Sequence, residues 1–194
     1  AKESLEQGRW TQGPDFCFWD YPLIELYGKT MGIIGYGRIG RATADIARAL
    51  GMQVLAYDAH VQDPACAPLE TVLRSSDVLS LHCPLTPETQ NMINRRTIGQ
   101  MKEGVILINT SRGGLMEEAD LRRALAQGRV YAAAVDVVST EPIRPDNPLL
   151  GLPNCLITPH IAWAPKESRK RLMDVAVENL RRFLEGKPQN IVNP

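Results

Sequence analysis

The chain has no excess charge of either sign, because 22 lysine and arginine residues match 22 aspartate and glutamate residues. Without net positive charge there is no general electrostatic attraction to nucleic acid or to an anionic membrane, so either partner would need a local basic patch. The densest basic segments, residues 169–171 and 181–182, fall on a predicted helix, where a solvated face is the simpler explanation. We therefore predict binding to neither partner.

Cysteine is scarce and no C-x-x-C pair occurs; the four cysteines are Cys17, Cys66, Cys83 and Cys155. This scatter indicates neither a zinc site nor the disulfide framework of a small secreted protein, so we predict no metal and reduced thiols. No apolar run approaches the length of a membrane span, and no signal peptide opens the sequence. Together these absences favour a cytoplasmic protein.

Aromatic residues are few beyond the start of the chain. Six of the eleven lie within the first 28 residues, at Trp10, Phe16, Phe18, Trp19, Tyr21 and Tyr27. This segment has little regular periodicity, so we expect its side chains to pack on another surface, and we predict a homodimer contact. Residues 1–7 look like the end of a helix that is already under way, and we expect that something upstream is missing.

The glycine-rich string at residues 35–40, Gly-Tyr-Gly-Arg-Ile-Gly, predicts a dinucleotide site because of what flanks it. The apolar run Thr30–Ile34 before it is typical of a buried parallel strand, and a helical pattern follows it. Gly35 would allow the tight turn, Gly37 would let the backbone approach a pyrophosphate, and Gly40 would let the helix pack closely on the strand. The helix N-terminus would then favour the anion.

A carboxylate follows at the position expected for ribose recognition. The predicted strand Gln53–Tyr57 ends at Asp58, which lies 18 residues after Gly40. A 2'-phosphate would meet a like charge there, and Ala59 and His60 supply no arginine, so the segment favours NAD over NADP. The alternative is a structural turn with an acidic residue beside it by chance.

Alternating strands and helices predict an α/β fold, a doubly wound parallel sheet of the Rossmann type with flanking helices. We expect the strand order 3-2-1-4-5-6. The predicted strands are residues 30–34, 53–57, 78–82, 105–109, 130–136 and 155–158. A long amphipathic helix is predicted from about residue 165 to 185, with a buried face formed by Leu172, Val175, Ala176, Leu180, Phe183 and Leu184.

Three polar residues that the scaffold does not need follow the ends of predicted strands: Arg112, Glu141 and His160. A parallel sheet gathers these ends along one edge. Arg112 could hold a substrate carboxylate, His160 could transfer a proton, and Glu141 could orient the imidazole, which together would make a carbonyl reduction site. The alternatives are a turn-filling histidine, a solvated loop glutamate and an arginine paired with surface acids.

Four motifs closely resemble the D-isomer-specific 2-hydroxyacid dehydrogenases. They are residues 26–40, the Asn109–Gly114 turn, the Asp136–Pro142 segment and Pro159–Ala162. The segments 19–23 and 160–164 look most like the glycerate dehydrogenases, also called hydroxypyruvate reductases. The resemblance covers nearly the whole chain. It implies hydride transfer between NADH and a small 2-oxoacid or D-2-hydroxyacid, with Arg112 binding substrate and with Glu141 and His160 as the proton-transfer pair.

The same resemblance implies cofactor contacts. It places the backbone of Arg38 and Ile39 on the pyrophosphate and Asp58 on the ribose. The remaining implied contacts are on the adenosine side, at Cys83, Pro84 and Thr89, and near the nicotinamide, at Thr110 and Asp136.

Members of the family insert the cofactor domain into a substrate domain built from both chain ends. The resemblance therefore implies a crossing-helix remnant and aromatic arm at 1–28, a Rossmann NAD-binding domain at 29–164, and a crossing helix and tail at 165–194. The substrate domain would be largely absent, so we expect NADH binding with little turnover of hydroxypyruvate. The alternative function is an NADH-sensing, corepressor-like binding module, since the family resemblance includes transcriptional corepressors.

Overall fold

A six-stranded sheet in which all pairs are parallel forms the centre of the protein. The computed structural model describes residues 2–20 and 22–192. Its strands are β1 (Thr30–Ile34), β2 (Gln53–Tyr57), β3 (Val78–Leu81), β4 (Val105–Asn109), β5 (Val130–Val135) and β6 (Cys155–Ile157). The helices are α1 (Lys2–Glu6), α2 (Arg38–Ala49), α3 (Leu69–Ser75), α4 (Arg95–Gln100), the 3-10 turn η1 (Gly113–Leu115), α5 (Glu118–Ala126) and α6 (Lys166–Leu184). The predicted α/β fold of the Rossmann type is confirmed.

The strand order is β2-β1-β3-β4-β5-β6, so the predicted order 3-2-1-4-5-6 is wrong. The third strand pairs with β1 on the side away from β2, where the prediction had placed the fourth. Among the described residues, the outer edge of β2 carries only an isolated parallel bridge between Ala56 and Cys66. The connection at 58–68 contains Pro64 and Pro68, which cannot donate to a ladder, and it is too short for a crossover helix. The place expected for a third strand is thus taken by one bridge.

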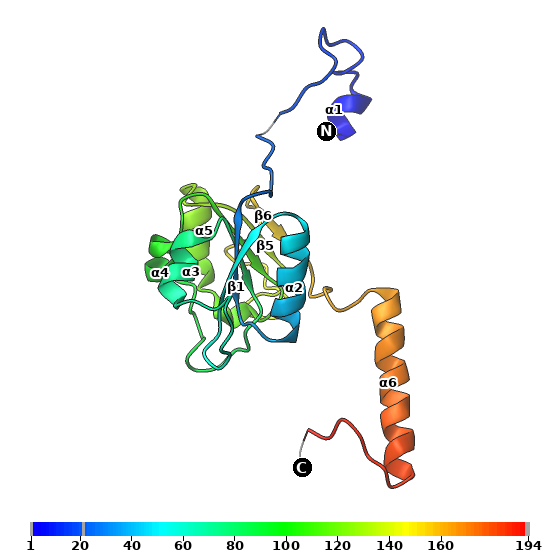
Figure 1. The fold of residues 1–194 in the computed structure, drawn as a ribbon. Helices are drawn as coiled ribbons and strands as arrows, with labels where there is room; N and C mark the ends of the chain where they lie inside the picture. Colours follow the sequence, from blue (N-terminus) through cyan, green and yellow to red (C-terminus); the bar gives the residue numbers. More distant parts are fainter. Residues whose placement is uncertain (1, 21, 193–194) are drawn as a thin grey trace.

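Helices cover both faces of the sheet, with α2 on one face and α3, α4 and α5 on the other (Figure 1). The larger core cluster includes Leu73 of α3, Leu121 of α5 and Leu107 of β4. A smaller cluster on the α2 face includes Ile33 and Ala44. Each fully buried leucine or isoleucine contributes about 1.5–3 kcal/mol through removal of apolar surface from water, so this two-sided burial holds the strand ends in place.

Both ends of the chain project away from the sheet (Figure 1). None of the residues of α6 is buried. Leu172, Leu180 and Phe183 are 59%, 61% and 68% exposed, and the other three residues of the predicted buried face are exposed as well. That prediction is therefore wrong for this chain, because the apolar stripe exists but no described element of the chain packs on it. Among the described helices, none is long and apolar enough to span a membrane.

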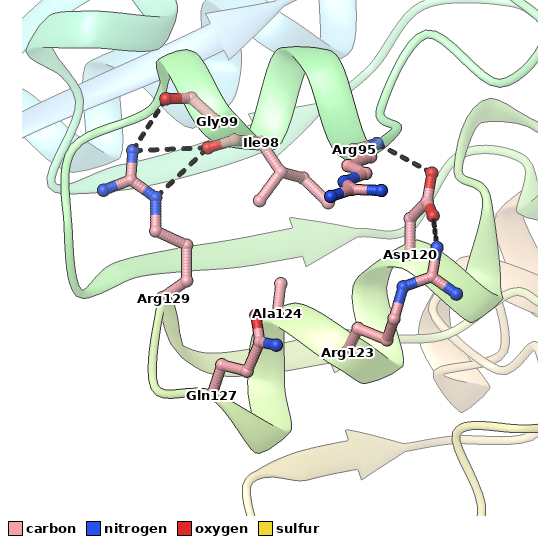
Figure 2. A pocket seen from close by; sticks show the side chains of 8 residues that line it. All are labelled: Arg95, Ile98, Gly99, Asp120, Arg123, Ala124, Gln127 and Arg129. Atoms are coloured by element: carbon pink, nitrogen blue, oxygen red, sulfur yellow. Dashed lines mark hydrogen bonds and ion pairs between the residues drawn. The ribbon is translucent and has the colours of Figure 1, made fainter.

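Two cavities lie outside the strand ends. One, of about 320 Å³, opens between α4 and α5 (Figure 2). The other, of about 360 Å³, lies within the N-terminal arm and is lined by residues that include Trp10, Phe18 and Trp19. Neither is lined by Arg112, Glu141 or His160, and all three of these residues are exposed.

Candidate active site at the carboxyl edge of the sheet

The glycine turn after β1 is shaped by two close contacts and one open position. Gly35 has a φ of +94°, and a Cβ there would lie 2.4 Å from the backbone nitrogen of Cys83. A Cβ on Gly40 would lie 2.1 Å from the carbonyl oxygen of Gly35, whereas a Cβ on Gly37 would meet nothing within 4 Å. Glycine is thus required at two positions by the fold, while the third leaves the backbone open to a ligand.

Helix α2 begins directly after this opening. Its N-cap residue is Gly37, and no side chain caps the end of the helix. The first N–H groups of a helix have no partner within the helix, so those of Arg38 and Ile39 can be offered to an anion. The positive end of the helix dipole acts in the same direction.

The Asp58 carboxylate is fixed beside the turn. Its Oδ2 accepts a hydrogen bond of 2.8 Å from the N–H of Tyr36, and its Oδ1 accepts one of 2.9 Å from the N–H of His60. Because each carboxylate oxygen can accept more than one hydrogen bond, both retain capacity for ribose hydroxyls. The nearby Arg41 guanidinium pairs with Asp63 at 2.7 Å.

The loop after β3 is closed by its own side chains. The Thr89 hydroxyl donates to the carbonyl of Pro84 at 2.7 Å and accepts from the N–H of Thr86 at 2.8 Å. Cys83 is buried, with its Sγ 3.7 Å from Sδ of Met92, and burial raises the pKa of its thiol to about 11. Cys83 therefore packs behind the glycine turn as a neutral thiol, and Pro84 and Thr89 shape the loop beside it.

The turn after β4 is locked against two neighbouring segments. The buried Asn109 amide donates to the carbonyl of Arg112 at 2.9 Å and accepts from the N–H of Ser111 at 3.0 Å. The Ser111 hydroxyl donates to the carbonyl of Cys83 at 2.6 Å, and a Cβ on Gly113 would lie 1.9 Å from the carbonyl oxygen of Val138. The backbone that carries Arg112 is thus held firmly.

Two exposed side chains project from this turn. Arg112 is exposed, and its Nη1 donates to the carbonyl of Ser111 at 2.7 Å. A guanidinium has five N–H donors, so most of its capacity remains for a ligand. Thr110 is exposed at the end of β4.

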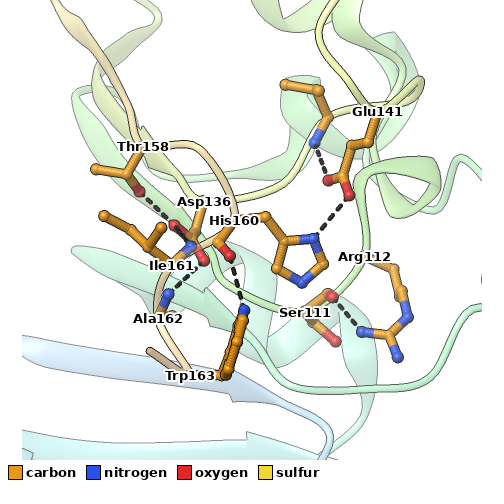
Figure 3. Close-up of polar contacts among 10 residues, drawn as sticks. Ser111, Arg112, Asp136, Glu141, Thr158, His160, Ile161, Ala162 and Trp163 are labelled. Carbon is orange, nitrogen blue, oxygen red and sulfur yellow. Dashed lines mark hydrogen bonds and ion pairs between the residues drawn. The ribbon is translucent and has the colours of Figure 1, made fainter. Parts of the chain in front are cut away.

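Glu141 and His160, from different strand ends, are in direct contact. Nδ1 of His160 lies 2.7 Å from Oε2 of Glu141, and Oε1 accepts from the N–H of Val138 at 3.1 Å. The hydrogen bond to His160 lowers the pKa of Glu141; burial opposes it, but the net pKa is below that of an ordinary glutamate. An ionised carboxylate only accepts, so Nδ1 carries the proton. Figure 3 shows the imidazole between Glu141 and the turn at Ser111 and Arg112.

Asp136 anchors the segment that carries the histidine. Its Oδ1 accepts from the hydroxyl of Thr158 at 2.5 Å and from the N–H of Ile161 at 2.9 Å, and its Oδ2 accepts from the N–H of Ala162 at 2.8 Å (Figure 3). Burial raises the pKa of Asp136, but these donors and His160 outweigh it, so the net pKa is lowered. The ionised carboxylate therefore holds His160 in its backbone conformation, with a φ of +54°.

Known proteins resemble this chain in sequence and in fold. Residues 1–162 match the model of the D-isomer specific 2-hydroxyacid dehydrogenase, NAD binding domain. The chain belongs to this family. A hydroxypyruvate reductase of Blautia hydrogenotrophica is 61% identical over 195 residues, which cover 97% of this chain and 61% of the relative. A glycerate dehydrogenase of Methylorubrum extorquens is 49% identical over 191 residues, which cover 97% and 60%.

A solved structure of this dehydrogenase family has the same fold. It is the NAD complexed form of the D-isomer specific 2-hydroxyacid dehydrogenase from Lactobacillus delbrueckii ssp. bulgaricus, with a TM-score of 0.81 and 31% identity, covering 98% of this chain and 64% of that one. The predicted resemblance and the assignment to an NAD-binding domain are confirmed. The chain spans about three fifths of the length of the curated relatives named above. Their enzyme names do not support the corepressor alternative.

Glu118 is a residue of this dehydrogenase domain that sequence reasoning missed. It is buried at the start of α5. Its Oε1 accepts from the N–H of Ser139 at 2.7 Å, and its Oε2 accepts from the Ser139 hydroxyl at 2.8 Å and from the Asn147 amide at 3.0 Å. It therefore holds the loop that leads to Glu141. A signal was present, because Glu118 precedes Leu121 by three residues and so lies on the buried face of the helix.

Proposed function

We propose that the chain is the cofactor domain of an NAD-dependent dehydrogenase that interconverts a small 2-oxoacid and a D-2-hydroxyacid. The observation that carries this proposal is the 2.7 Å contact between Glu141 and His160, at the same edge of the parallel sheet as the glycine turn. This edge is where open α/β sheets bind ligands. When bound, NADH would supply the hydride that reduces the carbonyl carbon.

The fit of NAD rests on three features of the chain. The open position at Gly37 and the uncapped start of α2 can receive a pyrophosphate. The Asp58 carboxylate lies at the end of β2, where it can accept hydrogen bonds from both hydroxyls of the adenosine ribose. For the remaining contacts, we propose Cys83, Pro84 and Thr89 on the adenosine side, and Thr110 and Asp136 beside the nicotinamide.

The proton is handled by His160 and Glu141. Glu141 keeps the proton on Nδ1, so Nε2 is the nitrogen that faces the reacting carbonyl. In reduction, Nε2 of the protonated imidazole gives its proton to the carbonyl oxygen, which becomes the hydroxyl. In oxidation, Nε2 takes that proton back. The carboxylate of Glu141 stabilises the imidazolium form in both directions.

Arg112 is proposed to bind the substrate carboxylate. Its guanidinium is exposed, on a backbone that Asn109, Ser111 and Gly113 hold in place. A planar fork of N–H donors matches a carboxylate in a bidentate manner, which would place the neighbouring carbonyl toward His160. The similarity to proteins named hydroxypyruvate reductase and glycerate dehydrogenase favours hydroxypyruvate and D-glycerate as the substrate pair.

We further propose a three-part organisation, with residues 1–28 and 165–194 flanking the NAD-binding domain at 29–164. The exposed apolar faces of both flanks support this division. We expect the chain to bind NADH, which is measured as a change in nicotinamide fluorescence, and to turn over little hydroxypyruvate, which is measured as loss of NADH absorbance. Rapid turnover by this chain would contradict the proposed organisation, and absence of NADH binding would contradict the proposed function.

The proton-transfer role has its own test. A panel of hydroxypyruvate, glyoxylate, pyruvate and phosphohydroxypyruvate, each with NADH, identifies the best substrate of a longer protein that includes this chain. His160→Gln should then lower kcat at least about 100-fold while NADH affinity stays unchanged, because general acid catalysis contributes that much or more. His60→Gln is the matched control, because His60 is exposed and its hydrogen bond to Asp58 is made by the backbone N–H, which glutamine keeps. Equal activity of the two variants would exclude His160 as the acid.

A homodimer is proposed through the aromatic arm. Phe16, Trp19 and Tyr27 are 90%, 65% and 75% exposed, and large exposed apolar patches mark contact surfaces. Tyr21, which belongs to the same predicted arm, lies outside the described residues. Light scattering coupled to size-exclusion chromatography should give twice the mass of the chain, and replacing Phe16 and Trp19 with serine should give the monomer mass. A wild-type monomer at high concentration would contradict this assembly.

A cytoplasmic location is also proposed. All four cysteines lie among the described residues and are free, and reduced thiols are typical of that compartment. Subcellular fractionation would test the location.

A further inference from the structure

The cavity between α4 and α5 is a preformed pocket that the dehydrogenase site does not use. It is lined by Arg95, Ile98, Gly99, Asp120, Arg123, Ala124, Gln127 and Arg129 (Figure 2). Its volume of about 320 Å³ is close to the lower end of the range for small-molecule sites, about 300–1,000 Å³. None of its residues belongs to the glycine turn or to the strand-end turns that carry Arg112, Glu141 and His160.

Hydrogen bonds to the backbone fix both ends of this pocket. At one end, Nη2 of Arg129 donates to the carbonyl of Gly99 at 3.0 Å and also to that of Met101, so Arg129 closes the carboxyl end of α4. At the other end, Oδ2 of Asp120 accepts from the N–H of Arg95 at 2.7 Å, which ties the start of α4 to α5. The two helices are thus pinned at a fixed separation, and the pocket does not need to form on binding.

The charge of the lining is positive, because three arginines face one aspartate. Asp120 is paired with Arg123 through one guanidinium nitrogen. Within the part of the chain that the structure describes, the guanidinium of Arg95 makes no hydrogen bond or ion pair. Figure 2 shows the Arg95 and Arg123 guanidiniums at the same end of the pocket, on either side of Asp120. Two guanidinium groups with spare N–H donors at one end of a pocket match an oxyanion.

The floor between the two ends is apolar. Ile98 is 4% exposed and Ala124 is 6% exposed, and both line the cavity. The side chain of Gln127 adds an amide on the α5 wall, and Figure 2 shows it beside Ala124. These two side chains leave only a small apolar surface in the pocket, which a short uncharged part of a bound molecule would contact and an inorganic ion would not reach.

We propose that this pocket binds a small organic oxyanion. Its charged head group is held by Arg95 and Arg123, and its uncharged part lies over Ile98 and Ala124. Arg129 keeps the far end of the pocket in shape through the carbonyls of α4, and its role is structural. This pocket shares no residues with the proposed cofactor site, so binding at the two sites can be measured separately.

Phenyl phosphate is the probe, because it joins an oxyanion to a short apolar ring, and inorganic phosphate and phenol each lack one of these parts. We expect phenyl phosphate to bind at least tenfold more tightly than either in titrations followed by NMR chemical shifts, with the largest shifts at Ile98, Gly99 and Ala124. Benzoate, tested in parallel, distinguishes a carboxylate from a phosphate as the preferred head group. Shifts confined to residues 35–40 would place the anion at the glycine turn and overturn the proposal.

The neighbouring residues Arg95 and Arg96 provide a matched pair of variants. Both are exposed in α4, but only Arg95 lines the pocket. Arg95→Gln should raise the Kd of phenyl phosphate about tenfold, the size expected for loss of one charge-assisted hydrogen bond, while Arg96→Gln should leave it unchanged. Arg123→Gln provides a second variant with the same expected direction. Equal weakening by Arg95→Gln and Arg96→Gln would indicate general charge attraction and contradict a defined site.

Discussion

The parallel sheet and the chain ends differ in how their apolar side chains are used. In the sheet, Leu79 and Leu107 are fully buried, and helices cover both faces. In α6, Leu180 and Phe183 lie on an equally regular apolar stripe but are 61% and 68% exposed. The same kind of sequence pattern therefore has two outcomes. The sheet forms its own core, whereas the ends carry surfaces suited to contacts that the described residues of this chain do not supply.

The sharpest way to break this comparison is to truncate one leucine in each region. Leu107→Ala should lower the free energy of unfolding by about 2–5 kcal/mol, because it removes buried surface and leaves a cavity in the sheet. Leu180→Ala, the matched control in α6, should change it by less than about 0.5 kcal/mol. Urea unfolding followed by circular dichroism measures both. Similar losses for the two variants would mean that α6 packs on the domain in solution.

Two glycines of the dinucleotide turn have different roles, because Gly40 is needed for packing and Gly37 is proposed to be needed for binding. Gly40→Ala would place a Cβ 2.1 Å from a backbone carbonyl and should cost about 1–3 kcal/mol of stability through overpacking. Gly37→Ala has open space around its Cβ, so its stability should remain within about 0.5 kcal/mol of the wild type. Its NADH affinity should fall, because the new methyl group stands where the pyrophosphate approaches. Thermal unfolding measures the loss of stability, and NADH fluorescence measures the loss of affinity. Unchanged NADH affinity in Gly37→Ala would contradict binding of the pyrophosphate at this turn.

The local sequence pattern predicted the strands and helices well, because each of these elements depends on residues that are close in sequence. The strand Thr30–Ile34 is apolar on both faces, and Gly51, which ends α2, has a φ of +77° as a left-handed stop requires. The strand order was missed because it depends on the connection at 58–68, which forms only the bridge between Ala56 and Cys66. The periodicity within a strand does not show on which side of β1 the third strand pairs.

The site was predictable to the extent that it follows from strand ends. Arg112, Glu141 and His160 could be placed at one edge because parallel strands end together, and the structure brings Glu141 and His160 into contact. Helical spacing places Glu118 on the buried face of α5, but its partner Ser139 is a loop residue 21 positions away in sequence, so the pattern does not show what Glu118 binds. The apolar stripe of α6 was read correctly, but a stripe does not identify the surface that covers it.

Replacing Asp136 should have a smaller effect on stability, and it tests whether a buried charge holds the carboxyl edge of the sheet in place. Asp136→Asn should lower stability by about 1–3 kcal/mol near neutral pH, because an amide nitrogen cannot accept the N–H of Ala162. The folded-state pKa of Asp136 is lowered, so its stabilising contribution is present above the unfolded-state pKa and is lost as pH falls through the folded-state value. The difference between variant and wild type should therefore shrink in acid, as urea unfolding at a series of pH values will show. A difference that is constant down to low pH would mean that the charge of Asp136 does not hold the histidine segment.

Glu141 should have the smallest effect on stability and a clear effect on chemistry. Its side chain and that of His160 are 36% and 45% exposed, so solvent screening limits the contribution of the pair to less than about 1 kcal/mol. Because the folded-state pKa of Glu141 is lowered, that contribution is present above the unfolded-state pKa of about 4.3 and disappears as pH falls through the folded-state pKa.

Glu141→Gln should therefore unfold at nearly the same urea concentration as the wild type at neutral pH. In a longer protein that turns over substrate, the same variant should lower kcat, because the imidazole of His160 loses the carboxylate that accepts from Nδ1 and fixes the orientation of the ring. Glu167→Gln, in the first turn of the exposed helix α6, is the control and should leave kcat unchanged. If Glu141→Gln kept the wild-type kcat, the contact with His160 would have no part in catalysis, and the edge of the sheet would differ from the chain ends in packing and not in chemistry.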